Sequence, residues 1–506
     1  MKQPIGTDLG EMIPLNGFVR RVAMASGITL LSLVTVKVMT LINSIVLARL
    51  LQPTDFGMYS VVVNLQNVVW TIAAFGIPVA LAKSISEFRN TDRVLSERIG
   101  SALLILLLVS STVSAIGLLL LADIVANNLY HDEGLVWVIR LSAIPVILGT
   151  LNLGLSSVLQ GCQSIRRLAE INAVAAAVTP PIAFLSVSEY GLVGAIVALT
   201  LSNAASSILL YVQVRRTISL SFSKGRSLLA DRPRFRSLMH FTIPAFISNL
   251  LVIPAYWIAK SVLALDSGFG SVGEFQIAES LSQIIMVLPV AMSIPLLPMI
   301  SEQSALNPEA VGRTSEGLLR IVMFLALPLS IIIMPFLQPA IGILYGGDYS
   351  AAYIPVLLMF ASSTFIAVAS VLSNVFMGIG RMWDMLLMNL IWLIVFLSTL
   401  FVFVPKGNAT GLASTYAVSY VALLLFLLAH YGNRFKSLIW GMVGATVAYF
   451  LFVVSFVTYL ADGDFVSKLV GCTATTIAFA LAGYALVLGN EERRLFKTAL
   501  ARLGSR

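Results

Sequence analysis

The sequence predicts an all-α polytopic membrane protein with about fourteen transmembrane helices. They form two six-helix lobes related by an internal repeat, plus two extra C-terminal helices. The first observation is composition: the 506 residues are 58% hydrophobic and 11% charged, with a mean hydropathy of +0.94, whereas soluble domains carry roughly 25% charged residues. The second is a succession of apolar runs that are each long enough to cross a bilayer. The third is that the second half of the chain echoes the first.

About 20 apolar residues cross the hydrocarbon core of a membrane. On that length the expected helices cover residues 24–48, 58–82, 99–127, 137–160, 169–187, 191–213, 239–265, 274–300, 317–341, 353–379, 383–404, 410–431, 438–460 and 468–489. The first two are joined by LARLLQPTDFGMYS, residues 47–60, which predicts a helical hairpin.

Basic residues orient these helices. Of the 32 Lys and Arg residues, all but six fall in alternate connections or at the termini, as the positive-inside rule requires if both termini are cytoplasmic. The six exceptions are Arg49, Arg140, Lys406 and Lys468 on the outer side, and Lys37 and Lys260 within helices. This placement explains the net charge of +8 without nucleic acid, because anionic lipid headgroups attract basic loops.

A repeat at a shift of about 216 residues divides the chain. Gly57-Met58-Tyr59 corresponds to Gly273-Glu274-Phe275, and IPVALAKSISE from Ile77 corresponds to IPLLPMISE from Ile294. Repeated bundles facing each other across a cleft are a common transporter plan. The expected domains are a cytoplasmic N-terminus (1–23), an N-lobe (24–213), a basic cytoplasmic linker (214–238), a C-lobe (239–431), the extra helices (432–489) and a cytoplasmic tail (490–506).

Polar residues follow one face of each of the four helices that the repeat makes equivalent. Neighbours on a helix face lie three, four, seven or eleven residues apart. The stripes comprise Lys37, Thr40 and Ser44; Ser60, Asn64, Asn67 and Thr71; Asn249, Tyr256 and Lys260; and Gln276, Ser280 and Gln283 beside Glu279. Interhelical hydrogen bonding, worth about 0.6 kcal/mol per contact, explains any single amide. The whole set, with two lysines, indicates a hydrated cavity between the lobes.

The intramembrane lysines predict the charge of the ligand. Lys37 lies near the middle of its helix, where a charge is costly and marks a functional site. Lys260 is about five residues from the outer helix end, where its chain could reach the interface. Lysines suit a carboxylate or diphosphate, whereas a cation exporter would hold a carboxylate at that depth. Glu279 could pair with a lysine or relay a proton, and Arg49 and Arg140 are candidates for the rim of the cavity.

Other classes fit the sequence less well. An enzyme such as a polysaccharide polymerase, ligase or glycosyltransferase needs a sizeable outer loop, and the outer loops here are short. The three histidines lie in separate segments and no GxxxxGK[ST] phosphate loop is present. We expect no catalytic residue, disulfide, metal site or cofactor, and the sequence leaves H⁺ or Na⁺ coupling open. A purely structural scaffold would leave Lys37 unexplained.

Two segments carry a family resemblance. ARLLQPTDFGMYSVV, residues 48–62, followed by FGIPVALAKSIS, residues 75–86, resembles the start of the polysaccharide-export flippases, in which a helix ends in A-R-x-L-x-P-x-D-F-G-x-Y. That family belongs to the multidrug/oligosaccharidyl-lipid/polysaccharide (MOP) superfamily, with the drug–cation antiporters (MATE) and the lipid II flippases. The resemblance implies MATE-like lobes that form an inward- or outward-open V.

The resemblance also implies a function. The expected substrate is an undecaprenyl-diphosphate-linked oligosaccharide, moved across the bacterial inner membrane by alternating access for O-antigen (lipopolysaccharide), capsule or exopolysaccharide export. Lys37 and Lys260 would hold the diphosphate or acidic sugars, and Asn64, Asn67 and Gln283 would bind sugar hydroxyls. The implied partners are this substrate, the bilayer and polysaccharide polymerase or export machinery. Fourteen helices rather than twelve make a lipid II flippase the first alternative, ahead of a multidrug or cation antiporter.

Overall fold

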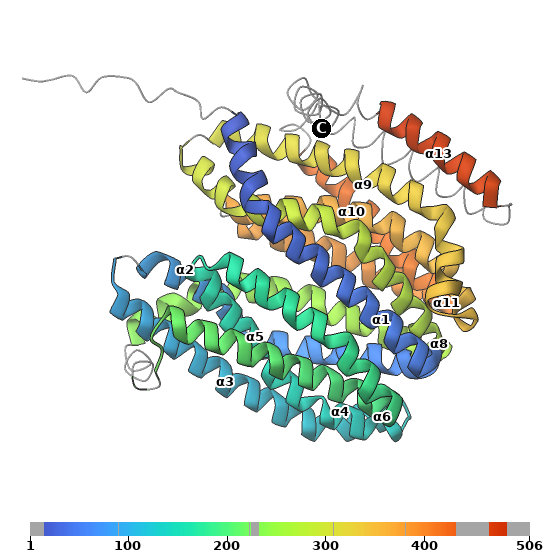
Figure 1. Cartoon of the computed structure of the whole chain (residues 1–506), viewed down its shortest axis with the longest axis horizontal. Coiled ribbons are helices and arrows are strands. Elements are labelled where there is room, and N and C mark those ends of the chain that lie inside the picture. Colours follow the sequence, from blue (N-terminus) through green and yellow to red (C-terminus); the bar gives the residue numbers. More distant parts are fainter. Residues whose placement is uncertain are drawn as a thin grey trace, which may run out of the picture.

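The computed structural model describes residues 15–431 and 465–482, except 90, 222, 224–231, 307 and 380. Nearly all of these residues are helical (Figure 1). The N-terminal half contains α1 (Leu15–Ala74), α2 (Ile77–Phe88), α3 (Arg93–Asp123), the π-helical turn η1 (Ile124–Leu129), α4 (Gly134–Leu141), α5 (Ala143–Gly161) and α6 (Ile165–Thr217). The C-terminal half contains α8 (Arg232–Leu306), α9 (Pro308–Leu344), the 3₁₀ turn η2 (Gly347–Ala352), α10 (Tyr353–Gly378), α11 (Met382–Tyr431) and α13 (Phe465–Ala482).

Four of the helices are folded hairpins rather than straight rods. A straight helix of the 60 residues in α1 would be about 90 Å long at 1.5 Å per residue, about three times the hydrocarbon thickness of a bilayer. Instead, single non-helical residues interrupt the longest elements: Gln52 in α1, Gly191 in α6, Gly268 in α8 and Asn408 in α11. Each interruption has a positive φ. The predicted hairpin over residues 47–60 is therefore present, with its kink at Gln52.

The internal repeat is visible in the positions of these kinks. Gly268 follows Gln52 by 216 residues, and Asn408 follows Gly191 by 217. The helices that contain them begin in the same register, because α11 starts 217 residues after α6, and α8 starts 217 residues after α1. The two halves are thus two copies of one helical bundle, as the sequence predicts.

The second predicted helix, 58–82, is shorter than expected. The first hairpin ends at Ala74, and α2 begins at Ile77 after two residues of positive φ, Phe75 and Gly76. Gly76 adopts the left-handed conformation that glycine tolerates, and Pro78 near the start of α2 has no N–H to pair. Proline is common in the first turn of a helix, so Pro78 marks the start of a new helix. A count of apolar residues does not detect this signal.

The described residues contain eight segments that are long and apolar enough to cross a membrane. Four of these hold the hairpins and cross twice, so the protein is a multi-pass membrane protein with two six-crossing halves. The expected helix at 438–460 lies outside the described residues, as does the end of the helix expected at 468–489. The start of the helix expected at 468–489 corresponds to α13, which packs against α9 at the edge of the bundle (Figure 1).

The two lobes meet mainly where α1 packs against α8. The end of the bundle that contains Gln52, Gly268 and Asn408 is called the Gln52 end below; Asn408 accepts a hydrogen bond from Ser267 there, at 3.0 Å. One buried apolar core extends through both lobes, whereas the N-lobe has a second core of its own around α2, α3 and α5.

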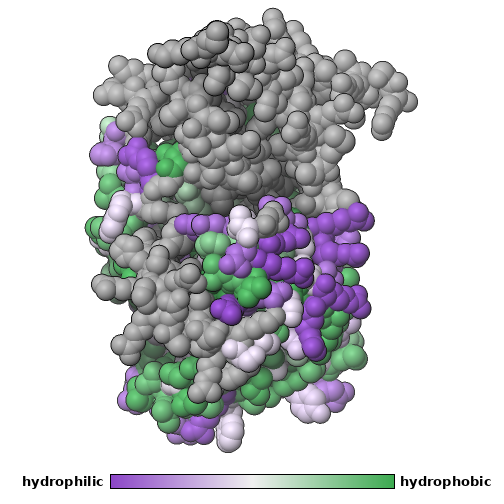
Figure 2. Space-filling model, turned by 90° about the vertical axis from the view of Figure 1, so that its left-hand side faces the viewer, coloured by the Kyte–Doolittle hydropathy of each residue, from purple (hydrophilic) through white to green (hydrophobic). Residues whose placement is uncertain are grey.

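Basic side chains are exposed at the opposite, α2 end. Figure 2 views this left-hand end of Figure 1, and hydrophilic side chains gather on part of it. Arg93 and Arg166 are both 72% exposed, and they belong to connections that the charge pattern predicts to be cytoplasmic.

Candidate functional site

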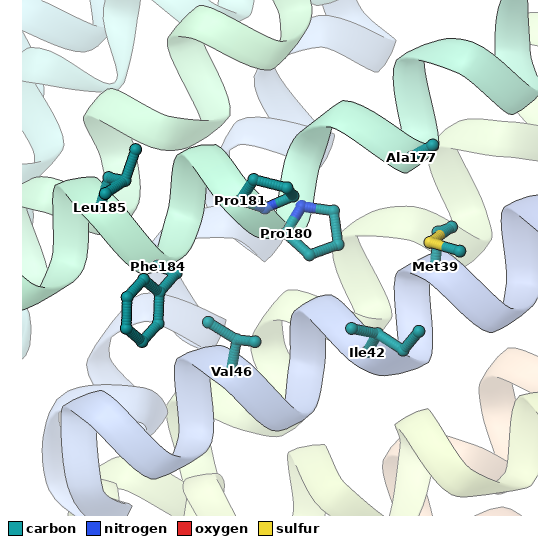
Figure 3. A pocket seen from close by; sticks show the side chains of 8 residues that line it. All are labelled: Met39, Ile42, Val46, Ala177, Pro180, Pro181, Phe184 and Leu185. Carbon is teal, nitrogen blue, oxygen red and sulfur yellow. The ribbon is translucent and has the colours of Figure 1, made fainter.

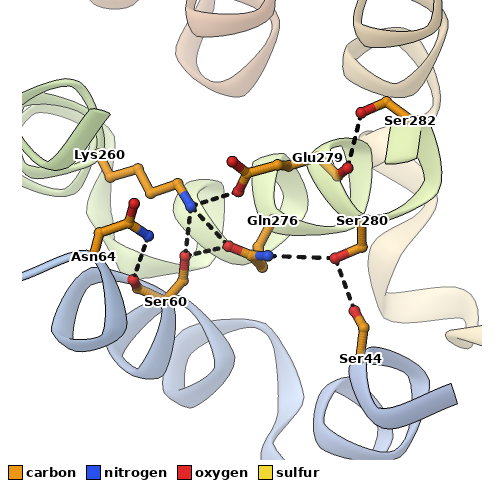
Figure 4. A network of polar contacts seen from close by, with 8 residues as sticks. All are labelled: Ser44, Ser60, Asn64, Lys260, Gln276, Glu279, Ser280 and Ser282. Carbon is orange, nitrogen blue, oxygen red and sulfur yellow. Dashed lines mark hydrogen bonds and ion pairs between the residues drawn. The ribbon is translucent and has the colours of Figure 1, made fainter. Parts of the chain in front are cut away.

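A polar network lies between the lobes, where the second crossing of α1 faces the second crossing of α8 (Figure 4). At its centre the Ser60 hydroxyl donates a hydrogen bond to the Gln276 side-chain oxygen. These two residues are 216 apart and occupy equivalent positions in the two repeats. Because equivalent residues can contact each other only on a symmetry axis, the network lies on the pseudo-two-fold axis of the molecule.

Lys260 is the buried cation of this network. Its side chain is 1% exposed. Although Lys260 lies near a helix end, its side chain therefore does not extend to the membrane–water interface. The Nζ atom donates to three acceptors: Glu279 Oε2 at 2.7 Å, Gln276 Oε1 at 2.8 Å and Ser60 Oγ at 3.1 Å. All three ammonium protons thus have partners, which is the condition for a buried charge to be tolerated.

The network continues along the second crossing of α8 to the first crossing of α1. Gln276 Nε2 donates to Ser280 Oγ at 3.3 Å, and the Ser44 hydroxyl of the N-lobe donates to the same Ser280 oxygen at 3.0 Å. Asn64 is half-buried and donates from Nδ2 to the backbone oxygen of Ser60 at 2.8 Å. The network therefore links all four helices that carry the predicted polar stripes.

Lys37 makes a separate bridge between the lobes. Its Nζ donates to Gln283 Oε1 at 2.7 Å, and both side chains are half-buried. Lys37 lies seven residues before Ser44, about 10 Å along the helix. Among the described residues, the ion pairs of the site include Lys260 but not Lys37, whose ammonium is held by a neutral amide. The two predicted lysines therefore both lie at the lobe interface. Lys260 is paired with a carboxylate, whereas Lys37 is paired with a neutral amide.

The remaining predicted residues divide between the interface and the N-lobe. Asn67 is half-buried on the same stripe as Asn64, one turn further from the Gln52 end. Arg49 contacts the C-lobe, because its guanidinium donates to the carbonyl oxygens of Leu344, at 2.7 Å from Nε, and of Ile343. Arg140 instead pairs with Asp123 of its own lobe at 2.7 Å.

An aromatic cluster beside Lys260 was not predicted. Tyr256 stacks on Tyr416 with ring centroids 5.7 Å apart, and its hydroxyl lies 3.2 Å from that of Tyr420. The Phe275 ring lies 6.0 Å from the Lys260 ammonium, within the range of a cation–π contact. The available sequence signal was the four-residue spacing of Tyr416 and Tyr420, which places both rings on one face of α11.

Two of the cavities formed by the described residues lie away from the lysines. The larger, of about 530 Å³, is an apolar groove between α1 and α6 (Figure 3), lined by Met39, Ile42, Val46, Ala177, Pro180, Pro181, Phe184 and Leu185. Its α1 residues follow Lys37 by two, five and nine positions, which places them on the opposite side of that helix. The smaller, of about 130 Å³, lies within the C-lobe and is lined partly by Ser370, Ser373 and Trp392.

The two bundles joined through paired polar helices define the class of fold, which is the one seen in solved structures of MOP-superfamily transporters. The structure is similar to that of the lipid II flippase MurJ in an inward closed conformation, with a TM-score of 0.67 at 12% identity over 90% of this chain and 98% of that one. It is also similar to an inward-facing multidrug resistance MATE family transporter, with a TM-score of 0.61 at 15% identity over 79% of this chain and 96% of the other.

The sequence shows the family within that class. The model of the polysaccharide biosynthesis protein family matches residues 24–304, and the chain belongs to this family. It is 23% identical to stage V sporulation protein B of Bacillus subtilis (strain 168) over 349 residues, which cover 63% of this chain and 66% of that relative.

Proposed function

We propose that this protein moves an undecaprenyl-diphosphate-linked oligosaccharide across the bacterial inner membrane for export of a surface polysaccharide. The observation that carries the proposal is the state of Lys37. Its ammonium lies between the lobes, half-buried, with a neutral amide as its partner. An anionic diphosphate or acidic sugar would replace Gln283 as the partner and would gain a charge-assisted hydrogen bond.

Lys260 takes a different role in this proposal. Glu279 already supplies its counter-charge, and Gln276 and Ser60 complete its hydrogen bonds. An incoming anion would have to displace all of these contacts. Lys37 is therefore the cation that receives cargo, while Lys260 holds the lobes together. Asn64 and Asn67, on the same face as Ser60, would hydrogen-bond sugar hydroxyls in place of water.

The surroundings of α1 support a substrate that is anionic at one end and apolar at the other. One side of this helix presents Lys37 to the C-lobe, and the other side lines the apolar groove at Met39, Ile42 and Val46. A lipid-linked head group would enter between the lobes while its polyprenyl tail remained in lipid. A drug-like cation lacks the anionic end, and Lys37 would repel it.

The same contacts supply the conformational step. Several hydrogen bonds between side chains cross the lobe interface, among them those from Lys37 to Gln283, from Ser44 to Ser280, from Ser60 to Gln276 and from Lys260 to Ser60. Alternating access requires them to break when the lobes rock apart and to form again on return. In the proposed orientation both termini are cytoplasmic, the Gln52 end faces outside, and a polysaccharide polymerase takes over the product there.

The experiment that tests this proposal measures the sidedness of lipid-linked oligosaccharide. Inverted inner-membrane vesicles are prepared from cells with and without the protein. Glycan in the lumen is measured as the lectin binding that appears only when the vesicles are permeabilised. Protein-dependent appearance of lumenal glycan is the expected result. No such glycan, with intact protein in the membrane, would contradict it. A parallel assay with labelled lipid II tests the first alternative, and ion-driven efflux of a cationic dye tests the antiporter.

A further inference from the structure

The segment Leu47–Ser60, which carries the family motif, makes four contacts with the C-lobe at the Gln52 end. Arg49 provides the first contact. Its guanidinium donates to the carbonyl oxygens of Leu344 and Ile343, the last residues of α9. Carbonyls in the last turn of a helix lack partners within the helix and carry its negative dipole end. The Arg49 guanidinium supplies both hydrogen-bond donors for these carbonyls and a positive charge next to the negative end of the dipole. Arg49 therefore caps a helix of the other lobe.

Two further contacts involve Tyr349, in the turn η2 that follows α9. Its hydroxyl donates to the backbone oxygen of Ala48 at 2.9 Å. Its ring also meets Phe56 edge to face, with centroids 6.4 Å apart, an arrangement that aromatic pairs favour. Phe56 is 1% exposed. The motif phenylalanine is therefore buried by a residue of the opposite lobe.

The fourth contact is reciprocal and follows the pseudo-two-fold axis. A Cβ atom on Gly57 would lie 1.8 Å from the backbone oxygen of Phe269, and one on Gly273 would lie 2.3 Å from that of Pro53. Gly57 and Gly273 are repeat equivalents, as are Pro53 and Phe269. The two copies of the hairpin thus press backbone against backbone, and only glycine at both positions permits this approach.

We infer that Leu47–Ser60 is a latch that closes the Gln52 end of the transport path, and that Gly57 and Gly273 are the residues that let it close. The four contacts lie on one short segment, so they break together when the lobes separate at this end. Ser60, one turn after Gly57, begins the polar network of Lys260. A closed latch therefore seals the polar site directly beneath it. The motif serves lobe closure, not recognition of a particular cargo.

The test measures the separation of the lobes without any substrate, so it stands whether or not the proposed cargo is correct. Spin labels are placed on Glu133 of the N-lobe and Lys406 of the C-lobe, both exposed. Both lie at the Gln52 end: Tyr130 packs on Phe269 at 5.8 Å, and Asn408 bonds to Ser267. The native thiols are removed by Cys162→Ser and Cys472→Ser. Distances are recorded by double electron–electron resonance in lipid nanodiscs.

Gly57→Ala and Gly273→Ala should each shift most of the distance distribution to longer values, because a methyl group cannot share the space of a backbone oxygen. Gly270→Ala is the matched control, since a Cβ there meets no atom within 4 Å, and should keep the wild-type distribution. Wild-type distances in both test variants would overturn the inference. If neither is recovered in folded form, Arg49→Ala decides: its exposed side chain can be removed without repacking, and an unchanged distribution would equally overturn the inference.

Discussion

Lys37 and Gln283 join the two lobes through a 2.7 Å hydrogen bond between a charged donor and a neutral acceptor. By contrast, Lys260 is held by a carboxylate and is almost completely buried. The two intramembrane lysines therefore differ in what an anion would gain by binding them. This difference leads to separate predictions for the two residues.

Removing the Lys37 ammonium should impair transport without reducing the amount of protein. A hydrogen bond to a charged group contributes about 1.5–3 kcal/mol, so Lys37→Ala should lower apparent substrate affinity about tenfold to a hundredfold. Lys37→Arg keeps the charge and should retain part of the activity. The measurement is lumenal lipid-linked glycan in inverted vesicles, normalised to protein by immunoblot. Lys406→Ala, at an exposed site, is the control. Full transport by Lys37→Ala would contradict the proposal that Lys37 binds the anion.

The Lys260–Glu279 pair should show unequal stability costs. Glu279→Gln removes the counter-charge from an ammonium that is 1% exposed, whereas Lys260→Met leaves a carboxylate that is 27% exposed and can be hydrated. Leaving one buried charge unpaired costs about 3 kcal/mol or more. We therefore expect a lower denaturation midpoint for Glu279→Gln than for Lys260→Met, and a recovery in the double variant. Equal losses that simply add in the double variant would show that the two groups are not coupled.

Much of the fold follows from sequence patterns because the bilayer imposes them. Span length, basic connections and the match of Gly57 to Gly273 were sufficient to predict paired helical bundles and a hairpin at residues 47–60. The stripe positions also gave the right faces, since Ser60, Gln276 and Ser280 do meet. What a stripe cannot give is the partner of each group, which depends on how two lobes distant in sequence pack together.

Three features were therefore missed or misread. Lys260 is buried because Glu279 and Gln276 lie opposite it, although its position near a helix end allowed it to reach the interface. Arg49 caps α9, a contact across 295 residues of sequence. The break at Phe75 shortens the second predicted helix, since a positive φ at a non-glycine residue has no signature in a hydropathy pattern.

The thiol of Cys162, in the short connection between α5 and α6, should react slowly with alkylating reagents. Burial raises the pKa of the Cys162 thiol, while the positive charge of Arg89 acts in the opposite direction. Because only the thiolate is reactive, its alkylation should increase at a higher pH than that of the same cysteine in denatured protein. Arg89→Ala should move the profile to still higher pH. Peptide mass spectrometry after timed maleimide treatment measures this, and identical profiles for native and denatured protein would contradict the prediction.

The kink at Gln52 should be improved by glycine. Gln52 has φ 62° and ψ 172°, a combination that costs a non-glycine residue about 1–3 kcal/mol. Its repeat equivalent, Gly268, has nearly the same conformation, with φ 81° and ψ 165°, and carries no side chain to strain. Gln52→Gly should therefore raise the denaturation midpoint, whereas Gly268→Ala should lower it although a Cβ there would have open space. Thermal unfolding of the purified protein in detergent measures both changes, and a lower midpoint for Gln52→Gly would mean that the glutamine side chain stabilises the kink more than its backbone strains it.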